Sequence, residues 1–410
     1  MSITKKKNEL NEKNKIDKKI FSALFFSIFA SVTGVGVVVP LLPIYAHDLG
    51  ASGLYIGMIF GSFSLSRTFF LPYFGRLSDK KGRKSYILAG LFAYFIISIG
   101  FIFSKNVESL IIIRFIHGIA SAMIMPVVQA YVGDITPKGR EGFVMGLFNM
   151  AMFSGLSIGP LIGGIINDHF SLQYTFVCMG FLSLTGFFLS LYLLPPTRLE
   201  NAAFKRPSPP AWGKLINDKM IAGLFFFRFG YTAGIGIIWG FLPVLAGVEL
   251  ELSASSIGFL VMLGVFASGS LQMPMGLLAD RINRTWMVIT GGLIVVVAMA
   301  SFEWATGFNH LVIVNLVFGF GGGIAMPALM AITIQKGKKS GAMGSVMALL
   351  TVGHSFGMFV GSTLAGLMMD FFELRHAFAL GSVIMAVCTG FFIICTFTKS
   401  KESAKMAGPH

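Results

Sequence analysis

Two long apolar runs are joined by the stretch Gly75-Arg76-Leu77-Ser78-Asp79-Lys80-Lys81-Gly82-Arg83-Lys84. A partial copy, Gly276-Leu277-Leu278-Ala279-Asp280-Arg281-Ile282-Asn283-Arg284, follows 201 positions later and keeps the glycine, the aspartate and the arginine in register. Further along, an offset of 202 pairs Asp168 with Asp370. The repetition predicts two halves with the same order and orientation of elements.

The composition predicts that these halves lie in a membrane. Hydrophobic residues make up 55% of the chain and charged residues 12%, whereas a soluble domain has roughly a quarter charged residues. Each of twelve apolar stretches has about the 20 residues that a helix needs to cross the hydrocarbon, where backbone groups must be satisfied within the segment. The stretches are 20–45, 54–75, 85–104, 109–131, 143–166, 174–194, 220–246, 256–277, 286–304, 309–331, 341–369 and 376–397.

The distribution of lysine and arginine predicts the orientation. Of the 32 basic residues, 27 fall in the amino terminus and the even-numbered connections, and only Lys105 and Arg375 fall on the other side. Basic residues stay preferentially in the cytoplasm, so both termini are expected there, in a plasma (inner) membrane. The net charge of +14 then reflects topology and attraction to anionic lipid headgroups, and nucleic-acid binding is not expected.

The chain divides into five segments. A basic cytoplasmic tail (1–19) precedes the first six-helix bundle (20–195), a proline-rich cytoplasmic linker (196–218) leads to the second bundle (219–397), and a tail follows (398–410). The three cysteines lie in apolar spans without metal-ligand spacing, so neither a metal site nor a cofactor is expected.

The pattern G-x-x-x-D-[RK]-x-G-R-[RK] after a second span resembles the loop signature of the major facilitator superfamily. This resemblance implies an all-α membrane protein with twelve transmembrane helices in two six-helix bundles related by pseudo-twofold symmetry. It also implies a secondary transporter that works by alternating access, and not an enzyme. The substrate site is expected between the bundles, near the midplane.

The family resemblance implies that the loop cluster latches the bundles together on the cytoplasmic side. Asp79 and Arg83 are four residues apart and can pair on a helical turn, while Gly75 and Gly82 permit close helix approach and a tight turn. Asp134 is expected as a further latch partner. The second copy retains Asp280 and Arg284 but has Asn283 in place of the glycine, which predicts a weaker latch. The alternative is a basic loop that only fixes orientation.

The fifth span carries a pattern that indicates the direction of transport. Its glycines and proline match G-x-x-x-G-P-x-x-G-G, which resembles the motif of drug:proton antiporters and related exporters. Glycines at this spacing let helices touch backbone to backbone, and the proline removes a hydrogen bond and bends the span. Ordinary helix packing is the alternative. The residues are Gly155, Gly159, Pro160, Gly163 and Gly164.

The fourth span contains Arg114-Phe115-Ile116-His117-Gly118, which resembles the R-x-x-Q-G motif of proton-coupled members. The resemblance links Arg114 to proton movement, and His117 supplies a titratable group where the family usually has glutamine. His354 in span eleven is the alternative coupling residue. Each histidine could instead be a buried residue that bonds a neighbouring helix.

Three arginines lie inside spans: Arg67, Arg114 and Arg228. A charge at the bilayer centre costs about 2.5–3.5 kcal/mol on insertion scales, so such residues usually face a cavity or a partner. No carboxylate falls deep inside a span, which favours an anionic or zwitterionic cargo over a cationic drug. The remaining residues expected at the substrate cavity are Gln129, Tyr231, Trp239 and Asn315.

The sequence therefore predicts proton-coupled export of a small, amphipathic, anionic organic molecule by a monomeric transporter in contact with membrane lipids. Three alternatives remain open. They are a symporter that imports an organic anion, a flippase for an anionic lipid, and a membrane receptor that does not transport.

Overall fold

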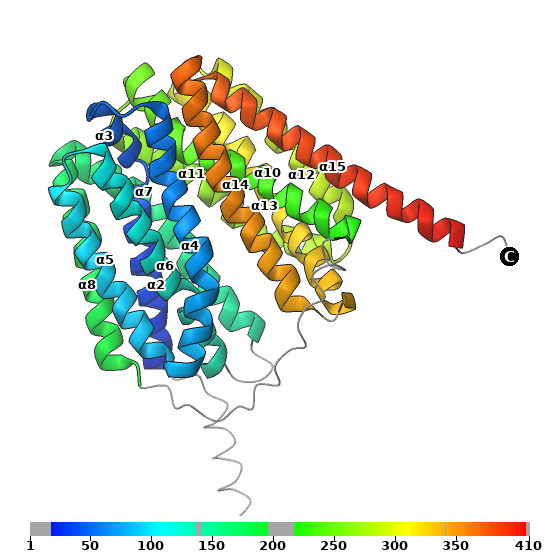
Figure 1. Ribbon diagram of the computed structural model, residues 1–410, viewed down its shortest axis with the longest axis horizontal. Coiled ribbons are helices and arrows are strands. Elements are labelled where there is room, and N and C mark those ends of the chain that lie inside the picture. Colours follow the sequence, from blue (N-terminus) through cyan, green and yellow to red (C-terminus); the bar gives the residue numbers. More distant parts are fainter. Residues whose placement is uncertain (1–17, 137–140, 196–216, 341, 407–410) are drawn as a thin grey trace, which may run out of the picture.

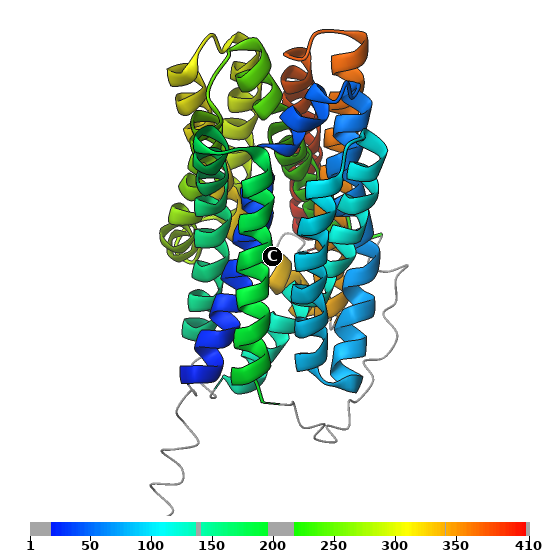
Figure 2. The ribbon, with the colours of Figure 1, turned by 90° about the vertical axis from the view of Figure 1, so that its left-hand side faces the viewer.

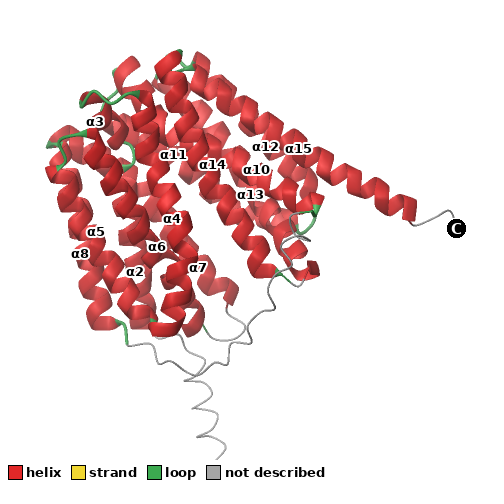
Figure 3. Ribbon diagram, in the orientation of Figure 1, coloured by secondary structure: helices red, strands yellow, loops and turns green. Residues whose placement is uncertain are grey.

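The computed structural model describes residues 18–136, 141–195, 217–340 and 342–406. Helices supply the regular structure in these ranges, which contain no strand (Figure 3). Twelve helical segments of the described chain are long and apolar enough to cross a membrane. The predicted all-α membrane protein is confirmed. The predicted linker and the amino-terminal tail fall almost entirely outside the described residues.

The described residues of the first half form seven helices. They are α2 (Lys18–Val38), α3 (Leu42–Asp48), α4 (Gly53–Lys81), α5 (Arg83–Phe103), α6 (Val107–Ile135), α7 (Glu141–His169) and α8 (Leu172–Leu193). The first predicted span is divided into α2 and α3 between Val38 and Leu42. Pro40 and Pro43 lie at this break, and proline cannot donate a backbone hydrogen bond.

The second half begins at α10. Its elements are α10 (Lys219–Val244), the π-helical turn η1 (Leu245–Glu249), α11 (Ala254–Ala279), α12 (Arg284–Ser301), the 3₁₀ turn η2 (Phe302–Trp304), α13 (Phe308–Ser340), α14 (Met343–Phe371) and α15 (His376–Met406). The helix α15 continues beyond residue 397, where the predicted span ends.

Helix starts are defined by polar side chains that accept backbone N–H groups. Ser52 accepts from Tyr55 at the start of α4, and Ser253 accepts from Ser256 at the equivalent start of α11. An N-cap of this kind satisfies a donor that has no partner within the helix. The two halves thus begin corresponding helices in the same way.

The internal repeat is also visible in how the helices pack. Gly118 on α6 lies against the carbonyl oxygen of Phe63 on α4, and Gly319 on α13 lies against that of Gly264 on α11. A Cβ at either glycine would overlap its neighbour, so the close approach requires glycine. The sequence offset of 201 therefore corresponds to the same contact in both bundles.

The two bundles meet mainly along two helix pairs, α4 with α14 and α7 with α11, and α10 lies near α3 and α4 as well. The helices of both bundles run between the two ends of the molecule (Figure 2), and Figure 1 shows α14 and α15 inclined relative to α4 and α5. We call the end with Lys80–Arg83 and Arg281–Arg284 the basic end, and the other the opposite end. Figure 1 shows α4 and α14 side by side at the opposite end and separating toward the basic end.

Candidate functional site

At the opposite end, an aspartate from each bundle binds the start of a helix in the other bundle. Asp168, in the last turn of α7, accepts the N–H groups of Ala254 at 3.0 Å and Ser255 at 2.8 Å. These two residues open α11. The first N–H groups of a helix lack partners within the helix and carry a partial positive charge, so they favour a carboxylate.

The second contact repeats the first with the halves exchanged. Asp370, in the last turn of α14, accepts the N–H groups of Gly53 at 2.5 Å and Leu54 at 2.8 Å. Both accepting groups are carboxylates, and all four donors are backbone amides at a helix start. We refer to these two arrangements as the carboxylate contacts.

Backbone atoms also touch beside the carboxylate contacts. Gly164 lies against the carbonyl oxygen of Ala254, and Gly366 lies in the same way against that of Gly53. Nearer the middle of the interface, Gly57 lies against the carbonyl of Ser362 and Gly258 against that of Pro160. Any larger residue at these glycines would force the helices apart, so the bundles are in direct contact at the opposite end.

The glycine and proline motif of the fifth span lies on α7 within this interface. Gly155, Gly159 and Gly163 pack against α2, where a Cβ on each would overlap the backbone or side chain of Thr33, Gly36 or Val37. Gly164 faces α11 instead. Backbone-to-backbone packing at this motif is thus confirmed, and the motif joins α7 both to its own bundle and to the other one.

At the basic end, the ion pairs among the described residues each join two residues of the same bundle. Arg83 pairs with Asp134 and, at 3.2 Å, with Asp79. In the second bundle, Arg284 pairs with Asp280 at 3.0 Å. The predicted pairing of the cluster is confirmed, whereas its action as a latch between the bundles stays a prediction.

Two glycines of the same loop behave differently. Gly82 has a φ of 94° and connects α4 directly to α5, which confirms the tight turn. Gly75 has no described neighbour within 4 Å of the position that a Cβ would occupy. The expected close helix approach at Gly75 is therefore absent in this conformation, in which α4 and α14 have separated.

Arg114 and His117 on α6 lie inside the first bundle. Arg114 is 2% exposed, donates to the carbonyl of Ile59 at 3.3 Å, and lies over the rings of Phe60 and Phe63. His117 is 0% exposed, and its Nε2 has no hydrogen-bond partner in the described structure. The structure therefore places neither residue in the space between the bundles.

His354 on α14 lies beside Arg228 on α10. The Nη2 of Arg228 donates to Nδ1 of His354 at 3.2 Å, and its Nη1 donates to the sulfur of Met326 at 2.7 Å. A guanidinium has no acceptor, so the imidazole must accept through an unprotonated Nδ1. In this conformation His354 is consequently neutral, with its proton on Nε2.

Arg67 on α4 approaches the same histidine from the other bundle. It lies within electrostatic range of His354, and its Nε is buried without a hydrogen-bond partner in the described structure. The register agrees, because Ser64 contacts Met358 at 3.9 Å and the next turn of α4 leads to Arg67 opposite the turn of α14 that holds His354. Arg67, Arg228 and His354 are thus brought together from three helices.

The other residues predicted to line a cavity are scattered. Tyr231 stacks on Phe318 inside the second bundle, and Asn315 is 1% exposed and donates to a carbonyl of its own helix. Gln129 is exposed on α6, and Trp239 is partly buried on α10. Eleven residues separate Trp239 from Arg228, which places the two on one face of the helix.

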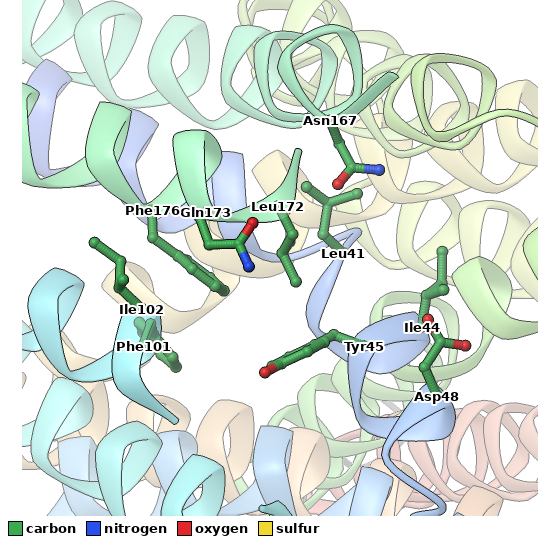
Figure 4. Close-up of a pocket in the computed structure, with 10 residues that line it drawn as sticks. All are labelled: Leu41, Ile44, Tyr45, Asp48, Phe101, Ile102, Asn167, Leu172, Gln173 and Phe176. Carbon is green, nitrogen blue, oxygen red and sulfur yellow. The ribbon is translucent and has the colours of Figure 1, made fainter. Parts of the chain in front are cut away.

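A separate cavity of about 210 Å³ lies at the opposite end of the first bundle (Figure 4). Its lining includes Tyr45, Phe101, Asn167 and Gln173. The hydroxyl of Tyr45 donates to the carbonyl of Ser104 at 2.6 Å, which ties α3 to the end of α5. The lining comes from one bundle only, so this cavity does not lie between the two.

A sequence model of the Major Facilitator Superfamily matches residues 24–235 and 224–408. The chain belongs to the Major Facilitator Superfamily. Both halves are included in the match, in agreement with the twelve spans and the internal repeat.

Other members of the superfamily resemble this chain over nearly its full length. The uncharacterized MFS-type transporter MJ1560 of Methanocaldococcus jannaschii is 30% identical over 387 residues, which cover 91% of this chain and 97% of the relative. The quinolone resistance protein NorA of Staphylococcus aureus is 26% identical over 361 residues, with coverages of 87% and 91%. The crystal structure of a mutant of the nucleoside transporter NupG has a similar fold, with a TM-score of 0.79 at 14% identity and coverages of 92% and 99%.

The carboxylate contacts were not predicted from the sequence, in which Asp168 and Asp370 stand out only as equivalent repeat positions. The signal that could have indicated a contact is the combination of two features: a carboxylate in the last turn of a span, present in both halves, and an equivalent capped helix start in the other half.

Proposed function

We propose that this chain is a secondary active exporter that moves a small amphipathic organic molecule by alternating access. The observation that carries the proposal is the difference between the ends of the interface. The bundles touch backbone to backbone at the opposite end, while α4 and α14 separate toward the basic end. A transporter that exposes its site to one side at a time needs a conformation of this kind.

Two observations support export. NorA is named as a quinolone resistance protein and is similar to this chain over most of its length. In the motif that resembles that of drug:proton antiporters, Pro160 and Gly164 touch α11 across the interface, while the other glycines pack against α2. A motif in this position acts on the step that opens the site to the outside.

We assign proton coupling to His354 in preference to His117. The charged groups that face His354 are Arg228 on α10 and Arg67 on α4. Protonation at Nδ1 would remove the acceptor that Arg228 uses, so uptake of a proton there requires Arg228 to release the histidine. His117 is enclosed by the rings of Phe63, Tyr94 and Phe101, so protons have less access to it.

The proposal includes a location and an orientation. The transporter lies in the plasma (inner) membrane as a monomer surrounded by lipids, with both termini in the cytoplasm. The basic end then faces the cytoplasm, as its lysines and arginines favour. The conformation described is therefore the one that is open to the cytoplasm.

The Arg228–His354 contact also favours a second candidate function, symport of the cargo with a proton. If protonation releases Arg228, the same event makes a guanidinium available to the cargo. Proton and cargo would then bind together, whereas antiport requires that they bind in turn.

Reconstitution into proteoliposomes with imposed pH and voltage gradients tests both candidates. For export, cargo moves uphill against proton entry, and reversing the pH gradient reverses the flux. His354→Asn keeps an acceptor near Nδ1 but does not titrate, so it should uncouple cargo flux from proton flux, while His117→Gln should remain coupled. Co-directional flux would select symport, and the absence of any solute flux across the panel would reject a transport function.

A further inference from the structure

The arginines of this chain fall into two groups according to their partners. Arg83, Arg284 and Arg375 each pair with a carboxylate near a helix end. Arg67, Arg114 and Arg228 lie within spans and have no carboxylate partner among the described residues. Arg114 packs inside its own bundle, which leaves Arg67 and Arg228 as the candidates near the interface. Guanidinium groups inside a span without a counter-ion are rare and usually mark a site of function.

Arg228 makes only weak contacts for a guanidinium. It donates to a thioether sulfur and to a neutral imidazole. A sulfur is a weak acceptor, and neither partner carries negative charge. The side chain is held in place while its charge remains uncompensated.

Arg67 lies on the turn of α4 that is opposite the turn of α14 with His354. Above it on α4, Gly61 lies against Phe359 and Ser64 contacts Met358, both on α14. About two turns farther toward the basic end, Gly75 has no neighbour within 4 Å among the described residues. Arg67 thus lies between the closed part of the interface and the part where the bundles separate.

Between the two arginines and the opposite end of the molecule, the neighbouring side chains are apolar. Phe60 lies seven residues before Arg67 on the same face of α4, and its ring is near Gly240 of α10. Trp239 shares the face of α10 that carries Arg228. A molecule that reached the two arginines from the basic end would meet cations first and an aromatic surface beyond them.

We propose that Arg67 and Arg228 together bind the carboxylate of an amphipathic organic anion, with one arginine from each bundle. A guanidinium presents parallel N–H groups that match the two oxygens of a carboxylate. His354 holds Arg228 in position while the site is empty and yields it when the anion binds. The inference rests on the proposed transport function but not on its direction.

A carboxylate held in this way connects α4 with α10 and α14. It neutralises two like charges that would otherwise resist the approach of the bundles at this level. Binding of the anion therefore favours the conformation in which the basic ends come together, because only a ligand with a differential interaction can shift that equilibrium.

The test is a comparison of acids with their neutral primary amides on the full-length protein in lipid nanodiscs. The probes are 1-naphthylacetate, 4-phenylbutyrate and decanoate, each beside its amide, with affinity measured by calorimetry. We expect at least one acid to bind about ten- to a hundredfold more tightly than its amide, the range of a charge-assisted hydrogen bond in a buried site.

Variants connect this preference to the two arginines. Arg67→Gln and Arg228→Gln should each remove most of the difference between acid and amide, whereas Arg67→Lys should keep its sign because the charge remains. Arg281→Gln, an exposed arginine at the basic end, is the matched control and should leave the difference unchanged.

The inference is overturned if no acid binds more tightly than its amide, or if both glutamine variants retain the preference. The comparison of acid and amide affinities in the unmodified protein tests the inference even if a variant fails to fold. If an amide is transported as rapidly as its acid, the transport function is supported but the anion site is rejected. If the acid binds but no flux is observed, the anion site is supported and the transport function is rejected.

Discussion

The two ends of the interface between the bundles are stabilised by different kinds of interaction. At the opposite end, carboxylates bind backbone N–H groups across the interface, and glycines place backbone against backbone. At the basic end, the described ion pairs stay within one bundle. The closed end depends on the shape of the backbone, whereas the charged clusters of the basic end can persist while the bundles move apart.

This difference has an energetic side. A hydrogen bond to a charged group contributes about 1.5–3 kcal/mol, so the carboxylate contacts are strong enough to favour one conformation. They remain weak enough to break, because each bond exchanges for one with water when the end opens. The glycine contacts provide close packing without adding charge, so closure at this end is expected to depend little on salt concentration.

The largest effect is expected from Gly164→Val. The added side chain would overlap the carbonyl of Ala254, at a cost above the roughly 1–3 kcal/mol of ordinary overpacking. The opposite end should fail to close, and transport should fall by at least about tenfold. Spin labels at Phe170, just after the end of α7, and at Glu251, shortly before the start of α11, should move apart.

Gly390→Val provides the control for that substitution. Gly390 lies on α15 with no described neighbour within 4 Å, so the same residue change should leave transport and the label distance unchanged. An unaltered distance in Gly164→Val would contradict the tight contact between α7 and α11.

Removal of the carboxylate contacts should have the next largest effect. In Asp168→Ala, the amides of Ala254 and Ser255 lose their acceptors, and hydrogen exchange at these amides should accelerate about tenfold. Asp370→Ala should do the same at Gly53 and Leu54 only. Each variant thus controls for the other, and equal acceleration at both helix starts in either variant would show that the contacts are not local.

A smaller effect is expected from Gly75→Leu at the basic end. The residue has open space around it here, so the protein should fold and keep this conformation. If the basic ends approach during the cycle, the leucine obstructs them, and about 1 kcal/mol of overpacking would slow transport roughly fivefold. Wild-type turnover in this variant would mean that α4 and α14 do not meet near Gly75.

The smallest effect is expected from Asp79→Asn. This change preserves size and leaves Arg83 paired with Asp134, and an exposed pair of this spacing contributes only about 0.3–0.5 kcal/mol. Turnover measured at normal expression should fall about twofold. Asp280→Asn in the second copy should change turnover less. Unchanged transport in Asp79→Asn would mean that the cluster only fixes the orientation of the protein in the membrane.

The spans and the repeat were predictable because they depend on properties that a sequence displays directly. Hydrophobic length identifies a membrane helix, and the offset between Asp79 and Asp280 identifies two halves. The pairing of Asp79 with Arg83 was predictable for the same reason, since residues four apart on a helix are neighbours.

The orientation of side chains was less predictable, because the sequence does not give the rotation of each helix. Arg67, Arg114 and Arg228 were expected to line one cavity, yet Arg114 packs against Phe63 within its own bundle. The partner of Gly164 was equally inaccessible, because the register of α7 against α11 is set by packing between halves that are far apart in the chain.

The contacts between the halves are isologous, like those of a homodimer: Asp168 binds the start of α11 as Asp370 binds the start of α4. A dimer of identical halves would have to carry every residue twice around its axis. In this single chain the position in the second half that is equivalent to Arg67 is Ser268. The pair of equivalent positions therefore carries one guanidinium, whereas a dimer of identical halves would carry two. The interface therefore keeps the symmetry of an assembly while its centre is asymmetric, and an asymmetric molecule can bind there in a single orientation.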